Sequence, residues 1–384
     1  TSSFVLNKNN QFGSAGRSAL YSTDVYVDDV SLRIELTATD TITFTRIAGS
    51  DNSDYRADWE SWEYIGSAGG PNEFIVRSRN TVTLTSAQRT QTATLDNTPD
   101  DIDKCIPFIT GISNTNTASE LNGPTALAWI SDTNTLNIER GGATGTTVVQ
   151  VVTVEFTGSN WRVAHGRLGD YTNDSGSVTL YSQADGQTTA FTINDTDNAF
   201  IAQTQHKGDD SDAGTQRVSN NYPATYISST TQVTYVHHTD HTVNDNQLFV
   251  HVLENADSSV TRYTDTGELA GDNNINITSA GVTDLSNTAI FATRQTAATG
   301  ISLPKGMANA RITSTTNAAL WCTRQGNTIE SRIEIVTMPL DTDGWYGDTC
   351  WQYRKKLTLD SSLVEADLTN FPVLISFTND SDLA

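Results

Sequence analysis

Residues Thr135–Gly166 read TLNIERGGATGTTVVQVVTVEFTGSNWRVAHG. The first arm of this stretch ends at Glu139-Arg140, and the glycines that follow can supply the positive φ angles of a tight connection. The second arm, Val148–Phe156, is rich in Val and Thr, and from Val152 onward apolar and polar residues alternate. Such alternation is typical of a strand with one face toward a core and the other toward water. The stretch therefore predicts a β-hairpin.

The chain contains the same pattern in three further stretches, residues 40–64, 232–254 and 319–338. Each has an alternating strand that ends in a basic residue, a polar or Gly-rich turn, and a second alternating strand. Aligning Arg46, Arg140, His237 and Arg324 gives steps of 94 (46 to 140), 97 (140 to 237) and 87 (237 to 324) residues. A period of this length suits tandem β-domains rather than a solenoid. We therefore predict an internal repeat.

The residues around these stretches predict which positions are equivalent. A short apolar strand precedes each of the last three copies, and we expect its Phe108, Phe200 or Phe291 at equivalent buried positions. On the first arm, we expect the same of Ile138, Tyr235 and Cys322.

The predicted fold class is all-β, with tandem β-sandwich domains of the jelly-roll or immunoglobulin-like kind. A chain of 384 residues is too long for one core, and domains of about 90 residues have an ordinary size. The leading domain is expected to lack a strand, because Leu20-Tyr21 matches the place of Phe108 and only Phe4–Leu6 stands ahead of it. The predicted domains are a strand-deficient leading domain at 1–79, sandwiches at 80–168, 169–263 and 264–340, and a strand-rich tail at 341–384.

The composition argues against several partners. The formal net charge is −22, so little in the chain can neutralise the phosphates of a nucleic acid. No segment approaches the roughly 18 apolar residues of a transmembrane helix. The chain opens at Thr1 without Met, which suits a processed N-terminus. Because acidic surfaces are common outside cells, we expect an extracellular or cell-surface location, with a virion as the alternative.

The three cysteines, Cys105, Cys322 and Cys350, do not have the spacing of metal ligands. A disulfide between Cys322 and Cys350 would tie the tail to the last domain, and Cys105 would then be left to pair between subunits. Buried or free thiols are the alternative.

The densest group of potential metal ligands is His237, His238, His241 and His251. A hairpin would bring His237 or His238 near His251, and neutral imidazole is a good ligand for zinc or copper. The other copies of the pattern lack these histidines, which favours a solvated polar turn. Calcium is a second candidate at the acidic residues 209–212 and 341–344, but neither stretch continues into a twelve-residue loop that ends in Glu. We therefore expect no cofactor.

No arrangement typical of a catalytic site is visible. Glu60 and Glu63 lie among aromatic residues, which suits a sugar site, but acids three apart on a strand point to opposite faces. No nucleophile elbow, phosphate loop or HExxH motif occurs. We predict that the protein is not an enzyme.

The composition changes after Pro339. Residues 351–360 (WQYRKKLTLD), 368–375 (LTNFPVLI) and 380–384 (DSDLA) resemble the start of domain of unknown function 2341. That family occurs in surface and secreted proteins of bacteria and archaea and in some viral proteins, often beside lectin-like β-sandwiches. The resemblance covers about the last tenth of the chain. It implies a location outside the cell or on a particle, and no catalytic residue.

These features predict a structural subunit of an extracellular filament, sheath, surface layer or viral particle. A sandwich without one strand has an open edge, which a strand from another copy can fill. Because donor and acceptor lie at opposite ends of the chain, such addition gives a head-to-tail homopolymer. The donor is expected in Leu357–Leu359 or Phe371–Phe377, with the alternating assembly residues Leu357, Leu359, Phe371, Val373, Ile375 and Phe377. If these strands instead begin a fifth domain, no polymer follows.

Two other functions remain open. One is a carbohydrate-binding adhesin, whose platforms for glycans would be Trp59, Trp62, Trp161, Trp345 and Trp351. The other is the non-catalytic part of a secreted polysaccharide-degrading enzyme.

Overall fold

The computed structural model describes residues 3–8, 15–17, 32–45, 54–115, 125–143, 145–169, 175–184, 188–206, 223–236, 247–268, 271–296, 309–322 and 328–338. Over these ranges the chain forms β-strands and short 3-10 helices and contains no α-helix. The predicted all-β, sandwich-like fold is confirmed. Residues 1–339 form one compact unit and residues 340–384 form a second.

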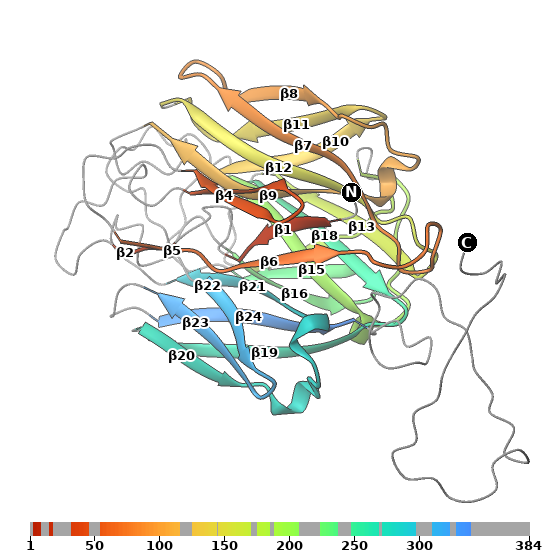
Figure 1. The fold of residues 1–384 in the computed structure, drawn as a ribbon, viewed down its shortest axis with the longest axis vertical. Coiled ribbons are helices and arrows are strands. Elements are labelled where there is room, and N and C mark those ends of the chain that lie inside the picture. The colour runs from red at the N-terminus through yellow and green to blue at the C-terminus, as the bar shows by residue number, and fades with distance from the viewer. Residues whose placement is uncertain are drawn as a thin grey trace, which may run out of the picture. The chain divides into compact units, whose positions relative to one another are not determined.

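Three consecutive groups of six strands have the same order of pairing. Figure 1 labels most of these strands. The second group contains β7 (Ile75–Leu84), β8 (Thr90–Thr94), β9 (Cys105–Asn114), β10 (Ala126–Asp132), β11 (Thr135–Arg140) and β12 (Thr147–Glu155). The third contains β13 (Trp161–Leu168), β14 (Ser175–Thr179), β15 (Ala199–His206), β16 (Ala224–Ser229), β17 (Gln232–Val236) and β18 (Gln247–Asn255). The fourth contains β19 (Ser259–Glu268), β20 (Gly271–Asn276), β21 (Thr288–Thr296), β22 (Asn309–Ser314), β23 (Asn317–Cys322) and β24 (Thr328–Thr337). In each group the sixth strand lies between the first and third, and the fifth lies between the second and fourth.

The leading group contains four strands that match the third to sixth strands of the other groups: β1 (Ser3–Asn7), β3 (Arg33–Ala38), β4 (Thr41–Thr45) and β6 (Trp59–Glu63). β1 pairs with β6, and β3 pairs with β4. Two short strands, β2 (Ala15–Arg17) and β5 (Asp54–Arg56), pair with each other. The strand that contains Phe4 therefore has the place predicted for Leu20-Tyr21, which lie outside the described residues. The internal repeat and the domain boundaries stay predictions, because unrelated sequences can also share a pairing order.

The hairpin predicted for residues 135–166 is wrong in its pairing. β11 pairs with β10 and β8, whereas β12 pairs with β9 and β7, so the two arms lie in different sheets. Arg140, at the end of the first arm, is buried in the connection, where its guanidinium donates to the carbonyls of Thr85 (2.7 Å), Gln88 (2.8 Å) and Gly145 (3.0 Å). The hairpin of each group is formed instead by the fourth and fifth strands.

A capping aspartate sets the start of the third strand in each complete group. Asp101, Asp195 and Asp284 accept a hydrogen bond from the N–H two residues later, at 3.0, 2.9 and 2.8 Å. Each bond begins a 3-10 turn, as expected for an Asp cap: η2 (Ile102–Lys104), η3 (Thr196–Asn198) and η6 (Leu285–Asn287). A further turn, η5, spans Thr278–Ala280. The third strand starts directly after η2, η3 and η6.

The position at which each third strand starts corrects the prediction of which residues are equivalent. Phe108 and Phe291 are each three residues after the start of their strand, whereas Phe200 is one residue after it. The three phenylalanines are therefore not equivalent. In the fifth strands, Ile138 and Tyr235 are equivalent as predicted, but the pairing places Leu320, not Cys322, at the same position.

A central hydrophobic cluster draws side chains from all four groups. The Phe4 and Phe108 rings stack with centroids 5.5 Å apart, and the Phe200 and Phe291 rings lie 4.8 Å apart. Trp62 packs against the same cluster. Separate clusters fill the sandwiches of the three complete groups.

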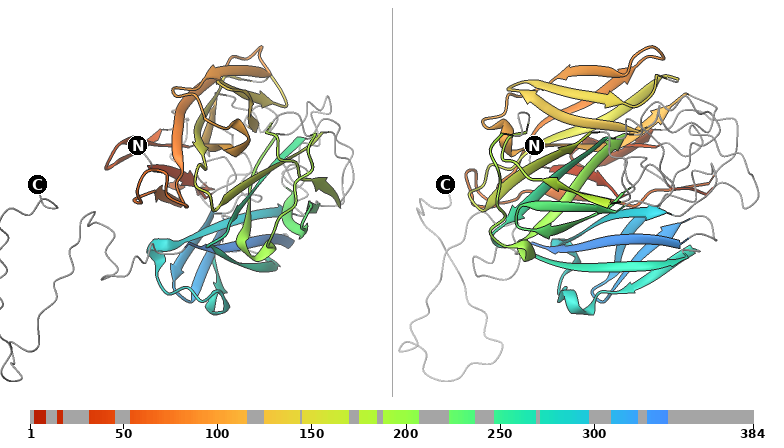
Figure 2. Two further views of the ribbon diagram at one scale, coloured as in Figure 1. Left: turned by 90° about the vertical axis from the view of Figure 1, so that its right-hand side faces the viewer. Right: turned by 180° about the vertical axis from the view of Figure 1, so that it is seen from behind.

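The four groups contact one another in a cycle. In each contact, the fourth strand of one group lies against the third strand of the next group. β3 meets β9 where Arg33 is paired with Gly111, and β10 meets β15 where Ala126 is paired with Gln205. Two Thr225–Thr293 hydrogen bonds, of 2.8 and 3.0 Å, join β16 to β21. The last contact returns to the leading group, where the N–H of Ala310 donates to the carbonyl of Lys8 at 3.4 Å. Figure 2 shows the leading strands (red) between the second group (orange to yellow) and the fourth (blue).

Candidate assembly site

Two strands of the leading group, β4 and β6, have fewer partner strands among the described residues than their equivalents in the complete groups. β6 pairs with β1 alone, and β4 pairs with β3 alone. The equivalent strands of the complete groups each have two partners. An unpaired edge presents a row of N–H and C=O groups to which another strand can bind.

Phe44 on β4 is exposed at a position that is buried in every complete group. It is paired with Ile34, whose side chain is buried, so Phe44 also lies on the core side of the sheet. The equivalent residues are Ile138, Tyr235 and Leu320. Their exposed fractions are 0%, 3% and 1%, against 46% for Phe44. The leading group therefore lacks cover at this point.

The lack of covering strands also accounts for the small core of the leading group. Its buried members are Val5, Leu32 and Ile34. In the second group, the first strand adds Val82 and Leu84 to a larger core. The described part of the leading group contains no first or second strand to make that contribution.

Lys8 and Glu60 join the leading group to the fourth group. The ammonium of Lys8 lies 2.6 Å from a carboxylate oxygen of Glu60 and donates to the carbonyl of Ile290 at 2.8 Å. It also lies 4.3 Å from the centre of the Phe291 ring. The other Glu60 oxygen accepts the N–H of Ile290 at 3.1 Å. Burial lowers the pKa of Lys8, and the carboxylate of Glu60 opposes this shift.

A cavity of about 90 Å³ lies where β1, β9, β15 and β21 meet, with room for several water molecules. Lys8, Phe108, Phe291 and His251 are among the residues that line it. Its lining thus includes the candidate metal ligand His251.

His251 pairs with a histidine that the sequence did not single out. His165 donates from Nε2 to the carbonyl of Asp103 at 2.9 Å, so its Nδ1 accepts the Nδ1–H of His251, also at 2.9 Å. Burial lowers the pKa of both rings, and for His251 the proximity of His165 lowers it further. Both imidazoles are therefore neutral, and Nε2 of His251 keeps a lone pair without a hydrogen-bond partner in the described structure.

The predicted metal sites do not appear in the part of the chain that the structure describes. His237, His238 and His241 and both acidic stretches lie outside it. Within it, no group of three or more His, Cys, Asp or Glu side chains is placed to hold a metal ion.

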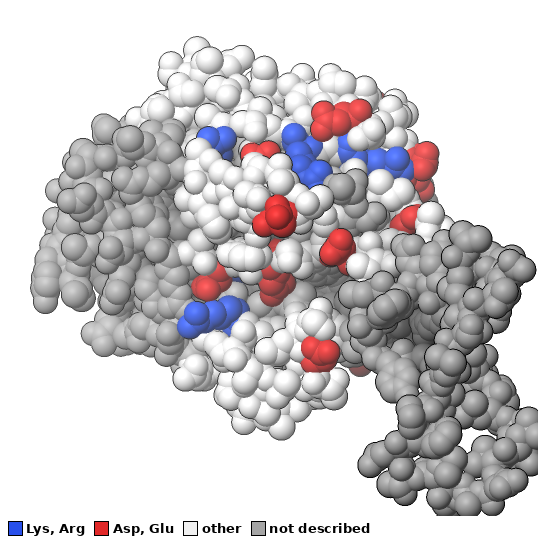
Figure 3. All heavy atoms as spheres, viewed as in Figure 1, with Lys and Arg blue, Asp and Glu red and all other residues white. Residues whose placement is uncertain are grey.

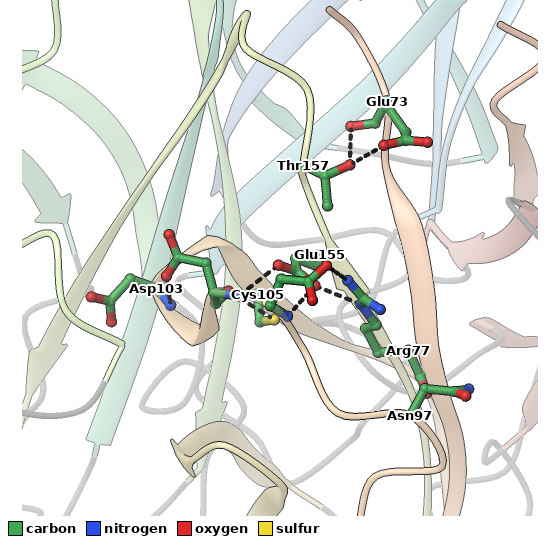
Figure 4. A network of polar contacts seen from close by, with 9 residues as sticks. Glu73, Arg77, Asn97, Asp103, Cys105, Glu155 and Thr157 are labelled. Atoms are coloured by element: carbon green, nitrogen blue, oxygen red, sulfur yellow. Dashed lines mark hydrogen bonds and ion pairs between the residues drawn. The ribbon is translucent and has the colours of Figure 1, made fainter. Parts of the chain in front are cut away.

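Glu155 at the end of β12 fixes the turn that precedes β9 (Figure 4). Its carboxylate accepts from Arg77 Nε at 2.5 Å, from the N–H of Asp100 at 3.1 Å and from the N–H of Asp101 at 2.7 Å. Cys105 lies beside it, a buried free thiol. Burial, and then the charge of Glu155, raise the pKa of this thiol. A protonated, buried thiol is poorly placed to form a bond with another subunit.

The remaining predicted assembly residues lie outside the described ranges. These are Cys350, the side chain of Cys322, and Leu357, Leu359, Phe371, Val373, Ile375 and Phe377. The predicted disulfide and donor strands therefore stay predictions.

The predicted glycan platforms in the described ranges differ in exposure. Trp161 is buried and its indole N–H donates to the carbonyl of Asn72 at 2.9 Å, so it is not a platform for a glycan. Trp62 packs against the central cluster, whereas Trp59 is exposed. Glu60 points inward to Lys8 and Glu63 is exposed, which matches the expectation that these two acids face opposite ways.

The charged side chains of the described residues are scattered on the face drawn in Figure 3. Acidic and basic groups are interspersed over a mainly uncharged surface there. Among the described elements, no helix has the length and apolarity needed to cross a membrane.

The site therefore consists of the edges of β4 and β6 that have no partner strand within the described ranges, with the exposed ring of Phe44. The resemblance of the tail to domain of unknown function 2341 stays a prediction. Neither a protein-family model nor a curated protein matches the chain.

Proposed function

We propose that the protein is a non-catalytic structural subunit that polymerises head to tail outside the cell or in a viral particle. Strands from the tail of one copy add to the leading group of the next. The observation that carries this proposal is Phe44, exposed on the core side of β4 where its three equivalents are buried.

Strand addition would bury the ring of Phe44 and would pair the edges of β4 and β6. Complete burial of a Phe side chain stabilises by about 1.5–3 kcal/mol. Nearly half of Phe44 is still available for burial, since its exposed fraction is 46%. Main-chain hydrogen bonds along β4 and β6 would add to this gain. Because the surfaces that meet are different, the contact repeats into a filament unless the rotation closes.

Removal of the tail tests the proposal. The full chain is expected to form polymers visible by electron microscopy and fast in sedimentation. A chain that ends at Leu340 is expected to keep its β-sheet circular dichroism and to sediment as a monomer. Long filaments from this shortened chain would contradict the proposal.

A substitution at the acceptor tests it without shortening the chain. Phe44→Lys places a charge where the added strand would pack, and is expected to abolish polymerisation while leaving the monomer folded. Leu285→Lys is the matched control, because Leu285 is a large apolar residue with a similar exposed fraction, 45%, on η6 of the fourth group. Equal polymerisation by the two variants would show that β4 is not the acceptor.

A further inference from the structure

The proposed polymer leaves open how many strands the leading group receives. We infer that the acceptor is a slot for two strands, one on β6 and one on β4, and that both segments of the tail fill it together. Residues 351–359 would lie along β6, and residues 371–377 along β4. The inference rests on the proposed function in one respect: the tail that fills the slot comes from a neighbouring copy of the protein.

The complete groups show what the slot should contain. β12, β18 and β24 each have a first strand on the side where β6 has none among the described residues. β11, β17 and β23 each have a second strand on the side where β4 has none. One added strand would cover only one of these two edges. Among the described residues, the leading group therefore lacks a pair of strands, and the two edges lie in different sheets.

The order of the chain places the tail at the corresponding point. β12 is followed by β13, and β18 by β19, so each sixth strand is followed by the first and second strands of the next group. The last described sixth strand is β24, which ends at Thr337. The next residue, Met338, packs against the central cluster, as does Trp62 of β6. The tail thus follows β24 where a first and a second strand follow the other sixth strands.

The first of these places can be compared with the sequence of the tail. Where the sixth strand joins the central cluster, its neighbour on the first strand is a valine: Val76 beside Val154, Val163 beside Leu253, and Val260 beside Val336. In the second and third groups an aromatic residue, Phe74 or Trp161, stands two positions earlier and joins the same cluster.

Trp351 and Tyr353 repeat this spacing, and Leu357 and Leu359 continue on the same side of an extended strand. In the second group, Val82 and Leu84 enter the sandwich core from the face opposite Val76, because the register shifts at Arg77. A tail strand at this place would need a similar shift between Tyr353 and Leu357. The second segment alternates in the same way, at Phe371, Val373, Ile375 and Phe377.

Hydrogen exchange of the full chain, read by mass spectrometry over residues 41–45 and 59–63, tests the inference. Both segments are expected to exchange slowly in the wild-type chain, because added strands protect edge amides. Leu357→Pro removes a donor from the strand on β6 and should speed exchange mainly in residues 59–63. Val373→Pro should speed exchange mainly in residues 41–45. Ser361→Pro, between the two tail segments, is the control and should change neither.

The outcomes separate the slot from the polymer. Fast exchange of either segment in the wild-type chain, or an effect of both proline variants on one segment only, would overturn the two-strand slot. Sedimentation of the same samples reports on the polymer. A monomer in which both segments are protected would reject head-to-tail assembly and support the two-strand slot. A polymer in which only one segment is protected would support head-to-tail assembly and reject the two-strand slot.

Discussion

The Nδ1 atoms of His165 and His251 lie 2.9 Å apart across the neighbouring strands β13 and β18. Both rings are buried, and each depends on the other for a hydrogen bond. A proton added to Nδ1 of His165 would leave two N–H donors facing each other, and a proton added to Nε2 of His251 would place a charge in a buried site. The pair is therefore most stable while both imidazoles are neutral.

Acid is expected to destabilise the fold through these histidines. Their pKa values lie below the ordinary value of 6.5, so the unfolded chain binds protons that the folded chain does not once the pH falls below about 6.5. Stability should fall with decreasing pH by up to about 1.4 kcal/mol per unit for each histidine. Urea unfolding between pH 7.5 and 5.5 measures this slope.

A variant isolates the contribution of the histidine pair from that of other groups. Glu334 contributes with the opposite sign, because burial raises the pKa of its carboxyl. His251→Gln should make the loss of stability in acid smaller, since the amide can still donate to His165. His237→Gln serves as a control that removes a histidine elsewhere. The same slope in all three proteins would contradict the expectation.

Removal of the Lys8 ammonium should destabilise the fold by several kcal/mol. Lys8→Met leaves Glu60 with a poorly solvated charge, and breaking one side of a buried pair typically costs about 3–5 kcal/mol. The double variant Lys8→Met, Glu60→Gln should recover much of this loss, because the Gln oxygen can still accept the N–H of Ile290. Chemical denaturation measures both, with Lys104→Met as the control. A double variant no more stable than Lys8→Met would argue against a charge effect.

Loss of one ring from the central cluster should affect the whole of residues 1–339. Phe200 is completely buried, and Phe→Ala at such a site costs about 3–5 kcal/mol. Because all four groups share the cluster, calorimetry should show a single transition that shifts to lower temperature in Phe200→Ala. Leu285→Ala, at an exposed residue, should shift it little. Independent transitions, of which only one moves, would indicate separately folding domains.

A methyl group at Gly111 should disturb the contact between the leading and second groups. The Cβ of an alanine would lie 2.2 Å from the carbonyl oxygen of Leu32 and 2.5 Å from the Cα of Arg33 on the neighbouring strand. Such overpacking typically costs about 1–3 kcal/mol. Gly169→Ala is the matched control, because the added Cβ meets nothing within 4 Å. Thermal unfolding that is equal for the two variants would contradict the observed approach of β3 to β9.

The sequence predicted the class of fold and many of the strands. Alternation from Val152 onward reports which residues face a core, and β12 closely matches the arm predicted at Val148–Phe156. The pairing could not be read in the same way, because both sheets of a sandwich turn apolar faces inward. Two strands joined by a Gly-rich turn therefore looked like a hairpin although they belong to opposite sheets.

The register of the third strands could not be predicted from the sequence for a related reason. Moving a strand by two residues keeps every side chain on its face, so Phe200 could be aligned with Phe108 without any conflict in burial. A local signal was present in the capping aspartates Asp101, Asp195 and Asp284. Each stands four residues before the third strand begins.

The buried polar pairs of the structure are contacts that no local pattern reveals. Lys8 meets Glu60, and His165 meets His251, only because the fold brings distant strands together. The exposure of Phe44 became informative only by comparison with Ile138, Tyr235 and Leu320 in the same register. The strands expected to cover it stay a prediction.

The bond between Lys8 and the carbonyl of Ile290 links residues 282 positions apart, which has a consequence for synthesis. At ~5–20 residues per second, the ribosome needs roughly 15–60 s to make the stretch between them. During that interval β1 has no partner from the fourth group, and the ammonium of Lys8 stays in water. The leading group is thus made before the fourth group but completed only with it, so the nascent chain should depend on chaperones that shield β1 until the fourth group has been made.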